Sequence, residues 1–320
     1  MSSAAGSLKV LVTCPPMLGM IDMFRLRFAA RQAEVMPAKV VQILSEDELC
    51  ELVPQFDGWI IGDDPASRRV FTAARAGRLR AAVKWGIGVD NVDFTACKDL
   101  GIPITNCPNM FGREVADLGM SYLTALARET FLIDREVRRG QWPKPRGLSL
   151  AGRTLGLVGL GDIGRSLARR ARAAELKVIA YDPFYAGAIE AGVELANWPE
   201  RVGEADFLAF TCSLTAANRH MLDAKVLARC KDGVRITNVA RGPLIDEAAL
   251  LAAMVSGKVH SVALDVFEVE PLPGDSGLRR LPNTIFGSHN GSNTVDGVVR
   301  CSEFAIDTLL GYLGAPAAAP

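Results

Sequence analysis

Short apolar runs alternate with amphipathic stretches along almost the whole chain. The apolar runs predict β-strands at residues 8–13, 58–61, 81–85, 154–158, 176–180, 233–237, 259–263 and 284–286. The amphipathic stretches predict helices at residues 22–34, 67–76, 113–139 and 165–173, the third being one helix or two joined helices. Strands separated by helices of about 10 to 15 residues are typical of βαβ units. We therefore expect an α/β protein whose parallel sheets carry helices on both faces.

Composition and charge narrow the class of protein. The chain has 320 residues, enough for two domains, and a Pro/Gly-rich loop at residues 140–150 separates two alternating series. Lys+Arg and Asp+Glu are both 36, which gives no support to a nucleic-acid or membrane-surface binder. No apolar run approaches the roughly 20 residues that span a bilayer. Residues 1–7 lack a signal-peptide pattern, so we expect a cytoplasmic protein.

Cysteine and histidine usage argues against disulfides and metal. The seven cysteines are scattered without a C-x-x-C pair, so we expect reduced thiols. The three histidines are not clustered with them, and we expect no metal site. His220 and His260 have no charged partner within a motif, and we assign them no role.

Residues 154–182 match a dinucleotide-binding unit. A strand pattern leads into Gly159-Leu-Gly161-Asp-Ile-Gly164, and a helix pattern follows. The first glycine permits a tight turn, the second lets the backbone approach a pyrophosphate, and the third lets the helix pack on the strand. Asp182, at the tip of the next predicted strand, is placed to accept hydrogen bonds from both ribose hydroxyls.

Two other interpretations of this loop stay open from these residues alone. A tight strand-to-helix turn needs no ligand, and a methyltransferase loop also places an acid near a ribose. The strand before, the helix after and the acid at the next strand end favour a dinucleotide. Asp182 would repel a 2′-phosphate, and residues 183–187 contain no Arg or Lys to offset it, so we expect NAD rather than NADP.

Three further polar motifs follow predicted strands. Arg241 lies in NVARG, Glu270 in LDVFEVEP and His289 in GSHNGSNT. Ligands bind outside the carboxyl ends of the strands in an open parallel sheet, so we expect these side chains at the edge that carries the glycine loop. Each residue alone is compatible with an ordinary exposed loop. Together they supply what hydride transfer to a carbonyl needs: a group that binds the substrate, an acid/base and a residue that orients it.

These motifs carry a family resemblance. In the order GLGDIG, NVARG, LDVFEVEP and SHNGSNT, they resemble the D-isomer-specific 2-hydroxyacid dehydrogenases, and within them the D-3-phosphoglycerate dehydrogenase-like branch. WGIGVDNVD at 85–93, NCPN at 106–109 and EVAD at 114–117 fit the same pattern, so the resemblance covers residues 8–310. It implies an NAD-dependent oxidoreductase that acts on the CH–OH group of D-2-hydroxy acids by reversible hydride transfer.

The resemblance also implies the architecture. It predicts two doubly wound parallel-sheet domains, with a Rossmann dinucleotide domain inserted in a flavodoxin-like substrate domain. Residues 1–107 and 288–320 would form the substrate domain and residues 108–287 the NAD-binding domain, with the catalytic cleft at the hinge. The family further implies a homodimer, built by the long helix near residues 113–127 and the loop around Trp142.

Residue roles follow from the family pattern. Arg241 would bind the substrate carboxylate and carbonyl oxygen, and His289 would donate or accept the proton. Glu270 would orient His289 and favour its charged form. The backbone amides of Ile87 and Gly88 would help to hold the substrate carboxylate. The cofactor would be held by Gly159, Gly161, Asp162, Ile163, Gly164 and Asp182, with Thr215 and Ala240 along the nicotinamide ribose and Asp265 at the nicotinamide amide.

The substrate stays open at this point. Phosphoglycerate enzymes of the family often have an arginine near the segment Gly62-Asp63-Asp64-Pro65, where this chain has two acids. Arg68 and Arg69 follow closely and are candidates to bind a phosphate. D-3-phosphoglycerate and related small acids such as glyoxylate or hydroxypyruvate all remain candidates. The alternative to an enzyme is an NAD(H)-sensing, corepressor-like binding protein of the same fold, because such proteins keep the Arg, Glu and His.

Overall fold

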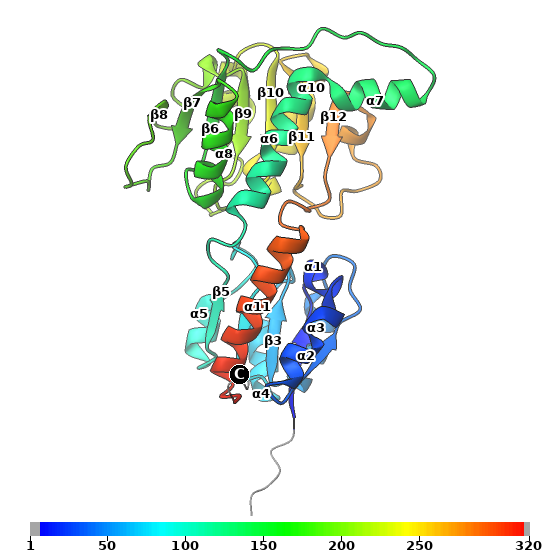
Figure 1. The fold of residues 1–320 in the computed structure, drawn as a ribbon, viewed down its shortest axis with the longest axis vertical. Helices are drawn as coiled ribbons and strands as arrows, with labels where there is room; N and C mark the ends of the chain where they lie inside the picture. The colour runs from blue at the N-terminus through cyan, green and yellow to red at the C-terminus, as the bar shows by residue number, and fades with distance from the viewer. Residues whose placement is uncertain (1–6, 317–320) are drawn as a thin grey trace, which may run out of the picture. The chain divides into compact units, whose positions relative to one another are not determined.

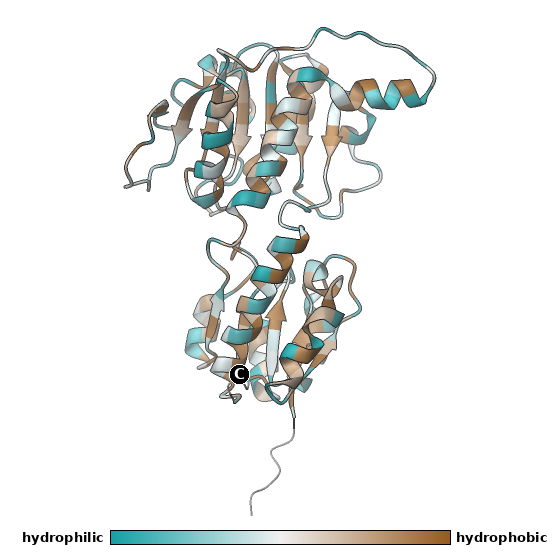
Figure 2. Ribbon diagram, in the orientation of Figure 1, coloured by the Kyte–Doolittle hydropathy of each residue, from teal (hydrophilic) through white to brown (hydrophobic). Residues whose placement is uncertain are grey.

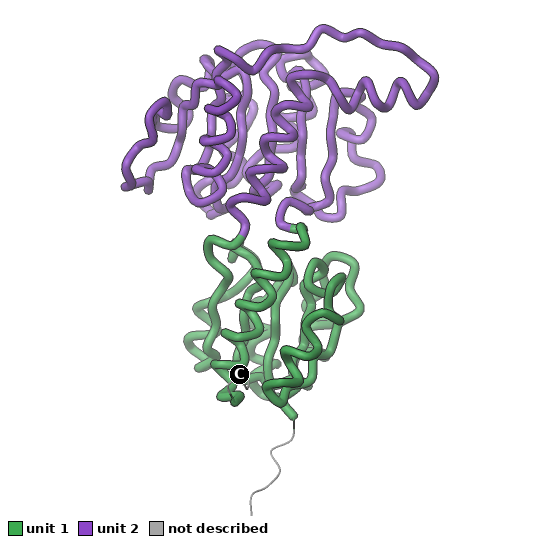
Figure 3. The backbone as a smooth tube through the Cα atoms, in the orientation of Figure 1, with its two compact units in different colours: residues 1–110, 293–320 green, residues 111–292 purple. Residues whose placement is uncertain are grey.

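The chain forms two compact units in a computed structural model that describes residues 7–316 (Figure 1, Figure 3). Unit 1 comprises Met1–Met110 and Asn293–Pro320, as far as these segments are described, and unit 2 comprises Phe111–Ser292. The unit boundaries fall at 110/111 and 292/293, a few residues after the expected 107/108 and 287/288. The assignment of the units to a substrate domain and an NAD-binding domain stays a prediction. Met1–Gly6, most of the segment that lacks a signal-peptide pattern, lies outside the described residues.

Unit 1 is built around a five-stranded parallel sheet of order β2-β1-β3-β4-β5. The strands are β1 (Leu8–Val12), β2 (Ala33–Pro37), β3 (Gly58–Ile61), β4 (Ala81–Lys84) and β5 (Ile104–Asn106). The helices are α1 (Pro15–Leu18), α2 (Ile21–Ala29), α3 (Glu46–Leu52), α4 (Arg68–Ala76), α5 (Phe94–Asp99) and α11 (Val295–Tyr312). This strand order is that of flavodoxin-like folds, with the switch point between β1 and β3.

The sheet of unit 1 has an apolar core on both faces. On one face Trp59 and Phe71 are fully buried, with ring centroids 5.9 Å apart, in a cluster that includes Leu49 of α3. On the other face the C-terminal helix α11 packs against β3 and β4. The side chains of Leu309 and Leu313 lie 3.0–3.1 Å from where a Cβ at Gly58 would be, so this close approach favours glycine.

Unit 2 is built around a seven-stranded parallel sheet of order β12-β11-β10-β9-β6-β7-β8. The strands are β6 (Thr154–Val158), β7 (Lys177–Tyr181), β8 (Val193–Leu195), β9 (Phe207–Phe210), β10 (Val234–Asn238), β11 (Val259–Leu264) and β12 (Thr284–Phe286). The helices are α6 (Gly112–Arg128), α7 (Thr130–Arg138), α8 (Asp162–Ala173), α9 (Ala224–Arg229) and α10 (Glu247–Val255). The order reverses between β6 and β9, as at the switch point of a Rossmann fold.

Both faces of the second sheet are covered. Leu155 and Phe207 point into a cluster with Leu167 of α8, whereas Leu208 lies in a second cluster with Leu250 of α10. Alternate residues of a strand therefore pack into the cores on opposite faces of the sheet. Because both faces are buried, the strand sequences are continuous apolar runs. Figure 2 shows the strands mainly in brown and much teal on the helices. The predicted fold class, two doubly wound parallel-sheet units, is confirmed.

Two predicted helices have different bounds in the structure. The helix expected at residues 22–34 ends at Ala29, because Gln32 takes a positive φ of 55° and residues 33–37 pair with β1 as β2. The stretch 113–139 forms two helices, since Glu129 adopts the left-handed conformation (φ 54°) between α6 and α7. Figure 1 shows α7 and the segment after it extending away from the sheet of unit 2. Among residues 7–316, no helix combines the length and apolarity needed to cross a bilayer.

Candidate functional site

The glycine loop joins β6 to α8 at the switch point of unit 2. Gly159 has φ +95° and its missing Cβ would lie 2.6 Å from the Cys212 nitrogen, so the turn requires glycine. A Cβ at Gly164 would lie 2.1 Å from the Gly159 oxygen, which explains the tight contact of helix and strand. A Cβ at Gly161 would meet nothing within 4 Å, so the backbone is open to a ligand at the N-terminus of α8. Asp162 and Ile163 form the first turn of that helix, whose free N–H groups favour an anion.

Asp182 follows β7 and supports the same loop. Its Oδ2 accepts a hydrogen bond from the Leu160 N–H at 2.7 Å, and its Oδ1 accepts one from the Phe184 N–H at 3.0 Å. The carboxylate is therefore fixed beside the glycine loop at the end of the neighbouring strand. This is the position expected for an acid that accepts hydrogen bonds from a ribose. Thr215 and Ala240, predicted to lie along the nicotinamide ribose, follow β9 and β10 at the same edge.

Arg241 lies in a loop that the Asn238 side chain holds in place. The Asn238 side chain accepts from the Ala240 N–H at 3.0 Å and donates to the Arg241 carbonyl at 2.8 Å. The guanidinium donates from Nη1 to the Ala240 carbonyl at 2.8 Å. At Gly242 a Cβ would overlap the Phe267 carbonyl carbon at 1.8 Å, so the loop after β10 packs directly on the backbone of the loop after β11.

His289 and Glu270 form a close acid–imidazole contact in unit 2. His289 Nδ1 lies 2.7 Å from Glu270 Oε2, and both side chains are largely buried. The other oxygen of Glu270 accepts from the Phe267 N–H at 2.9 Å, which fixes the carboxylate. His289 has φ +55°, a conformation that needs support from its neighbours. A carboxylate bonded to Nδ1 favours the imidazolium and directs Nε2 to proton transfer.

Asp265 is a buried anchor for the loop of His289. Its carboxylate, in a residue only 2% exposed, accepts from the N–H groups of Asn290 at 3.1 Å and Gly291 at 2.9 Å. Its carbonyl accepts from the His289 N–H at 2.7 Å. Burial raises the pKa of Asp265 above its ordinary value, and burial together with Asp265 raises the pKa of Tyr122. The Asp265 carboxylate thus holds this loop. Its predicted contact with the nicotinamide amide stays a prediction.

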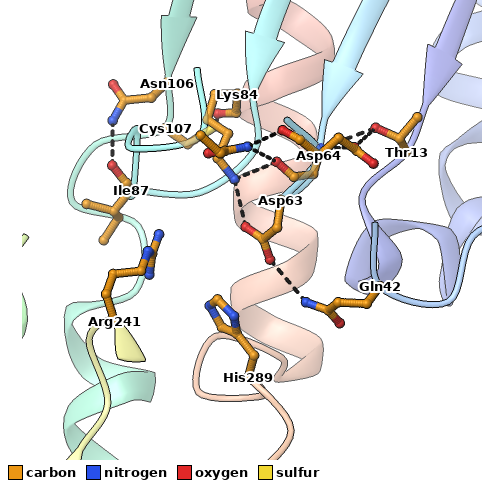
Figure 4. A network of polar contacts seen from close by, with 12 residues as sticks. Thr13, Gln42, Asp63, Asp64, Lys84, Ile87, Asn106, Cys107, Arg241 and His289 are labelled. Atoms are coloured by element: carbon orange, nitrogen blue, oxygen red, sulfur yellow. Dashed lines mark hydrogen bonds and ion pairs between the residues drawn. The ribbon is translucent and has the colours of Figure 1, made fainter. Parts of the chain in front are cut away.

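In unit 1, Ile87 and Gly88 follow β4 in a turn that starts at Gly86, with φ +106°. The Ile87 carbonyl accepts from the Asn106 side chain at 3.0 Å, and the Gly86 carbonyl accepts from the Cys107 N–H at 3.0 Å. These bonds fix the turn against the end of β5, as Figure 4 shows for Ile87 and Asn106.

An acidic loop lies next to this turn. Asp63 follows β3, and its carboxylate accepts from the buried Lys84 Nζ at 3.1 Å and from Gln42 at 3.4 Å (Figure 4). Asp64 is fully buried and accepts from the Thr13 hydroxyl and the Leu44 N–H. Burial raises the pKa of Asp64, and Thr13 and Leu44 oppose that rise. Both acids lie at the carboxyl ends of strands of the same sheet as Ile87.

The profile of one family matches a large part of the chain. Residues 120–291 match the D-isomer specific 2-hydroxyacid dehydrogenase, NAD binding domain. The chain is 36% identical over 277 residues to hydroxypyruvate reductase of Thermotoga maritima, covering 85% of this chain and 89% of that protein. The chain belongs to the D-isomer-specific 2-hydroxyacid dehydrogenase family.

Other members of the 2-hydroxyacid dehydrogenase family are also similar. D-3-phosphoglycerate dehydrogenase 3, chloroplastic, of Arabidopsis thaliana is 39% identical over 284 residues, which are 86% of this chain and 48% of that protein. The chain thus spans about half the length of the curated phosphoglycerate dehydrogenases it matches. Among solved structures, the TT0316 protein of Thermus thermophilus superimposes with a TM-score of 0.83 at 30% identity, over 96% of this chain and 97% of that chain. The predicted family is therefore confirmed.

The geometry also reveals polar residues that the motifs did not assign. Glu247, Glu268 and His220 form a cluster behind the loop of Glu270. Glu268 lies within the motif LDVFEVEP, so the sequence could have singled it out. Its partners Glu247 and His220 are distant in sequence, and no motif connects them with Glu268. Within residues 7–316, no group of three or more His, Cys, Asp and Glu side chains is arranged to hold a metal ion.

Proposed function

We propose that this chain is an NAD-dependent D-2-hydroxyacid dehydrogenase that interconverts a small 2-hydroxy acid and its 2-keto acid. The observation that carries the proposal is the 2.7 Å contact between His289 Nδ1 and Glu270 Oε2. It lies on loops that follow β12 and β11, in the sheet whose β6 leads into the glycine loop. An oriented imidazole at the same sheet edge as a dinucleotide loop is an arrangement suited to proton-coupled hydride transfer.

The residues of this chain fit the cofactor. The open backbone at Gly161 and the first turn of α8 suit a pyrophosphate, and Asp182 suits the adenosine ribose. When bound, NADH would supply the hydride for reduction of the keto acid, and NAD+ would accept the hydride in oxidation of the hydroxy acid. The family profile that matches unit 2 is that of an NAD binding domain, which supports this cofactor.

The protein side chains move the proton and hold the substrate. In reduction, His289 gives the Nε2 proton to the carbonyl oxygen, which becomes the hydroxyl of the product. Glu270 keeps its hydrogen bond to Nδ1 and so stabilises the imidazolium before transfer. Arg241 binds the substrate carboxylate through its planar guanidinium, and the amides of Ile87 and Gly88 assist. In oxidation, neutral His289 accepts the hydroxyl proton.

We further propose that the substrate is a small acid without a phosphate, such as glyoxylate or hydroxypyruvate. Beside the turn of Ile87 the chain has Asp63 and Asp64 in place of an arginine, and the buried Lys84 ammonium is paired with Asp63 at 3.1 Å. This segment therefore offers no guanidinium to bind a phosphate. Arg68 and Arg69, the candidates for a phosphate, are paired with Asp99 at 2.7 Å and with Asp47 at 2.6 Å. The similarity to hydroxypyruvate reductase of Thermotoga maritima supports the same substrate class.

Initial rates of NADH oxidation test both proposals. The panel is glyoxylate, hydroxypyruvate, pyruvate and 3-phosphohydroxypyruvate at equal concentrations. We expect the highest kcat/KM with one of the three acids without phosphate. A preference for 3-phosphohydroxypyruvate would refute the substrate assignment. Tight NADH binding without turnover of any acid would favour the corepressor-like alternative over an enzyme.

We also propose a homodimer. None of the residues of helix α7 is fully buried within the chain, and Phe131 (49%), Val137 (41%) and Trp142 (78%) are exposed. A groove of about 570 Å³ along α6 and α7 includes Met120, Thr124 and Phe131. A second copy would cover this apolar surface. Light scattering coupled to gel filtration should give about twice 34.3 kDa, and Phe131→Asp should shift the mass toward the monomer.

The cytoplasm is the location we propose. The seven cysteines are all free thiols, five of them buried, which is compatible with a reducing compartment. Fractionation of cells that express the tagged protein checks this assignment.

A further inference from the structure

Two glutamates of unit 2 exchange hydrogen bonds between the start of α10 and the loop that follows β11. The Glu247 N–H donates to Glu268 Oε1 at 2.9 Å, and the Glu268 N–H donates to Glu247 Oε1 at 2.7 Å. Glu247 is the first residue of α10, so its N–H lacks a partner within the helix. Glu268 supplies that partner, and the positive end of the helix dipole favours both carboxylates.

A third segment faces the same carboxylate. His220 Nε2 lies 3.2 Å from Glu268 Oε1, within ion-pair range although not in hydrogen-bond geometry, and Arg219 lies 3.8 Å from Oε2. The His220 N–H donates to the Pro243 carbonyl at 2.7 Å, which ties this segment to the loop that follows Arg241. His220 has φ +53°, a conformation that persists only where its surroundings impose it.

The Glu247–Glu268–His220 cluster contacts the loops that carry the proposed catalytic residues. Glu268 follows Phe267, whose N–H donates to Glu270 Oε1 at 2.9 Å. The loop of Arg241 meets the same two residues, because a Cβ at Gly242 would overlap the Phe267 carbonyl and lie 2.4 Å from the Glu268 nitrogen. The Glu247–Glu268 pair therefore lies where the loops of Arg241 and Glu270 touch.

We propose that Glu268, held by Glu247 and faced by His220, is a positioning residue that fixes the Glu270–His289 pair relative to Arg241. The proposal rests on the proposed function, because it assigns a purpose to the orientation of those three groups. Glu268 acts through the backbone of residues 267–270 and does not itself bind substrate or cofactor.

The charges of the cluster are compatible with this role. Burial raises the pKa of Glu247, and the neighbouring carboxylates of Glu268 and Glu270 add to the rise. The backbone bond from Glu268 opposes it, and His220 and Arg219 offset the charge of Glu268. Glu270 bonds to the His289 ring, and the buried carboxylate of Asp265 interacts with that ring electrostatically. A carboxylate that served only to cap α10 would leave the Glu270–His289 pair unchanged.

An NMR titration separates positioning from capping. The chain has only three histidines, so imidazole resonances are few and His289→Gln assigns the signal of His289. Glu268→Gln removes the charge but keeps an acceptor for the Glu247 N–H, whereas Glu268→Ala removes both. We expect Glu268→Ala to lower the pKa of His289 by about half a pH unit more than Glu268→Gln does. Equal shifts in both variants would indicate a charge effect alone and would overturn the proposal.

Kinetics provide the second measurement. We expect Glu268→Ala to lower kcat about tenfold while the Kd for NADH changes less than about twofold. The matched control is Asp246→Ala, which removes the cap of the same helix at the Ala249 N–H (2.9 Å). It should lower Tm but keep kcat and the pKa of His289. If Asp246→Ala reproduced the loss of kcat, helix stability would explain the effect and the proposal would be wrong.

The remaining outcomes are also informative. If Glu268→Ala did not fold, Glu247→Ala removes the acceptor of the Glu268 N–H and should lower the pKa of His289 in the same way; no shift there overturns the proposal. The titration needs no turnover, so it separates the two claims. If the wild type reduced no 2-keto acid but the Glu268 variants still showed the expected difference in the pKa of His289, the proposed function would be refuted and the positioning role would stand. If the wild type were active and the Glu268 variants kept its kcat and its pKa of His289, only the positioning role would be refuted.

Discussion

His289 Nδ1 lies 2.7 Å from Glu270 Oε2 across two loops that follow neighbouring parallel strands, β12 and β11. The backbone prepares both groups. Glu270 is fixed by the Phe267 N–H, and His289 is fixed by its own N–H bond to the Asp265 carbonyl at 2.7 Å. An acid/base whose partner is immobilised before substrate arrives loses little free energy to reorganisation when the proton moves.

Replacing Glu270 by Gln should displace the pH profile of the reaction. The carboxylate favours the imidazolium, so the variant should have a lower pKa at His289 than the wild type. Keto-acid reduction uses the charged ring and falls as pH rises through that pKa, whereas oxidation uses the neutral ring and rises. Both profiles should therefore move to lower pH in Glu270→Gln. The measurement is kcat/KM against pH in each direction.

A matched control for this experiment is Glu194→Gln. Glu194 is an exposed acid of unit 2, paired with Arg201 at 2.8 Å. The same change of charge at this position should leave both profiles in place. Overlap of the Glu270→Gln profiles with those of the wild type would show that Glu270 does not act on His289.

His289→Ala and Arg241→Ala should each remove most turnover while NADH binding persists. Neither side chain is assigned to the phosphates or the adenosine. Loss of a general acid typically lowers the rate by about 10²–10⁴-fold. Steady-state rates and NADH fluorescence titration measure the two effects. An active His289→Ala variant would exclude the proposed acid/base, and loss of NADH binding in both variants would indicate a disturbed fold.

Asp182 should set the choice between NADH and NADPH. Its carboxylate would repel a 2′-phosphate, so the wild type should prefer NADH. Asp182→Ala should narrow the difference in kcat/KM between the two cofactors. Because Asp182 also accepts from the Leu160 and Phe184 N–H groups, Asp182→Asn separates the loss of charge from the loss of loop support. A wild type that preferred NADPH would contradict the role of Asp182.

Two glycines of one loop should respond differently to alanine. A Cβ at Gly164 would lie 2.1 Å from the Gly159 oxygen, so Gly164→Ala should destabilise the fold by about 1–3 kcal/mol. A Cβ at Gly161 would meet nothing within 4 Å, so Gly161→Ala should keep Tm. It should weaken NADH binding roughly tenfold, or about 1.4 kcal/mol, if the backbone approaches the pyrophosphate there. Thermal unfolding and NADH titration measure both, and unchanged NADH binding in Gly161→Ala would contradict the cofactor assignment.

The sequence was sufficient to predict the bounds of some strands, whereas other strands could not be detected from it. β3, β6 and β12 have the predicted bounds because a buried apolar run ends at a polar or glycine turn. β5 and β8 are three-residue edge strands with too little periodicity to detect. β9 is the fully buried run Phe207–Phe210, which periodicity alone cannot distinguish from helix.

The candidate site shows a similar division. The motifs place Arg241, Glu270 and His289 at one sheet edge because chain order fixes which loops leave that edge. They do not reveal that Glu268 meets Glu247, 21 residues away, since such a contact depends on how two loops pack. Nor do they show that Arg68 and Arg69 are paired with acids of neighbouring segments.

Unit 1 is assembled from two distant parts of the chain, and this bears on biosynthesis. Helix α11 covers one face of its sheet, with Leu309 against Gly58 and Ser302 accepting from the Trp85 indole at 3.0 Å. A ribosome releases these residues only after the whole of unit 2 has emerged. We therefore expect unit 2 to fold first and the N-terminal half of unit 1 to wait with an exposed apolar sheet face. Nascent chains stalled before residue 295 should accordingly bind chaperones through the β3–β4 surface.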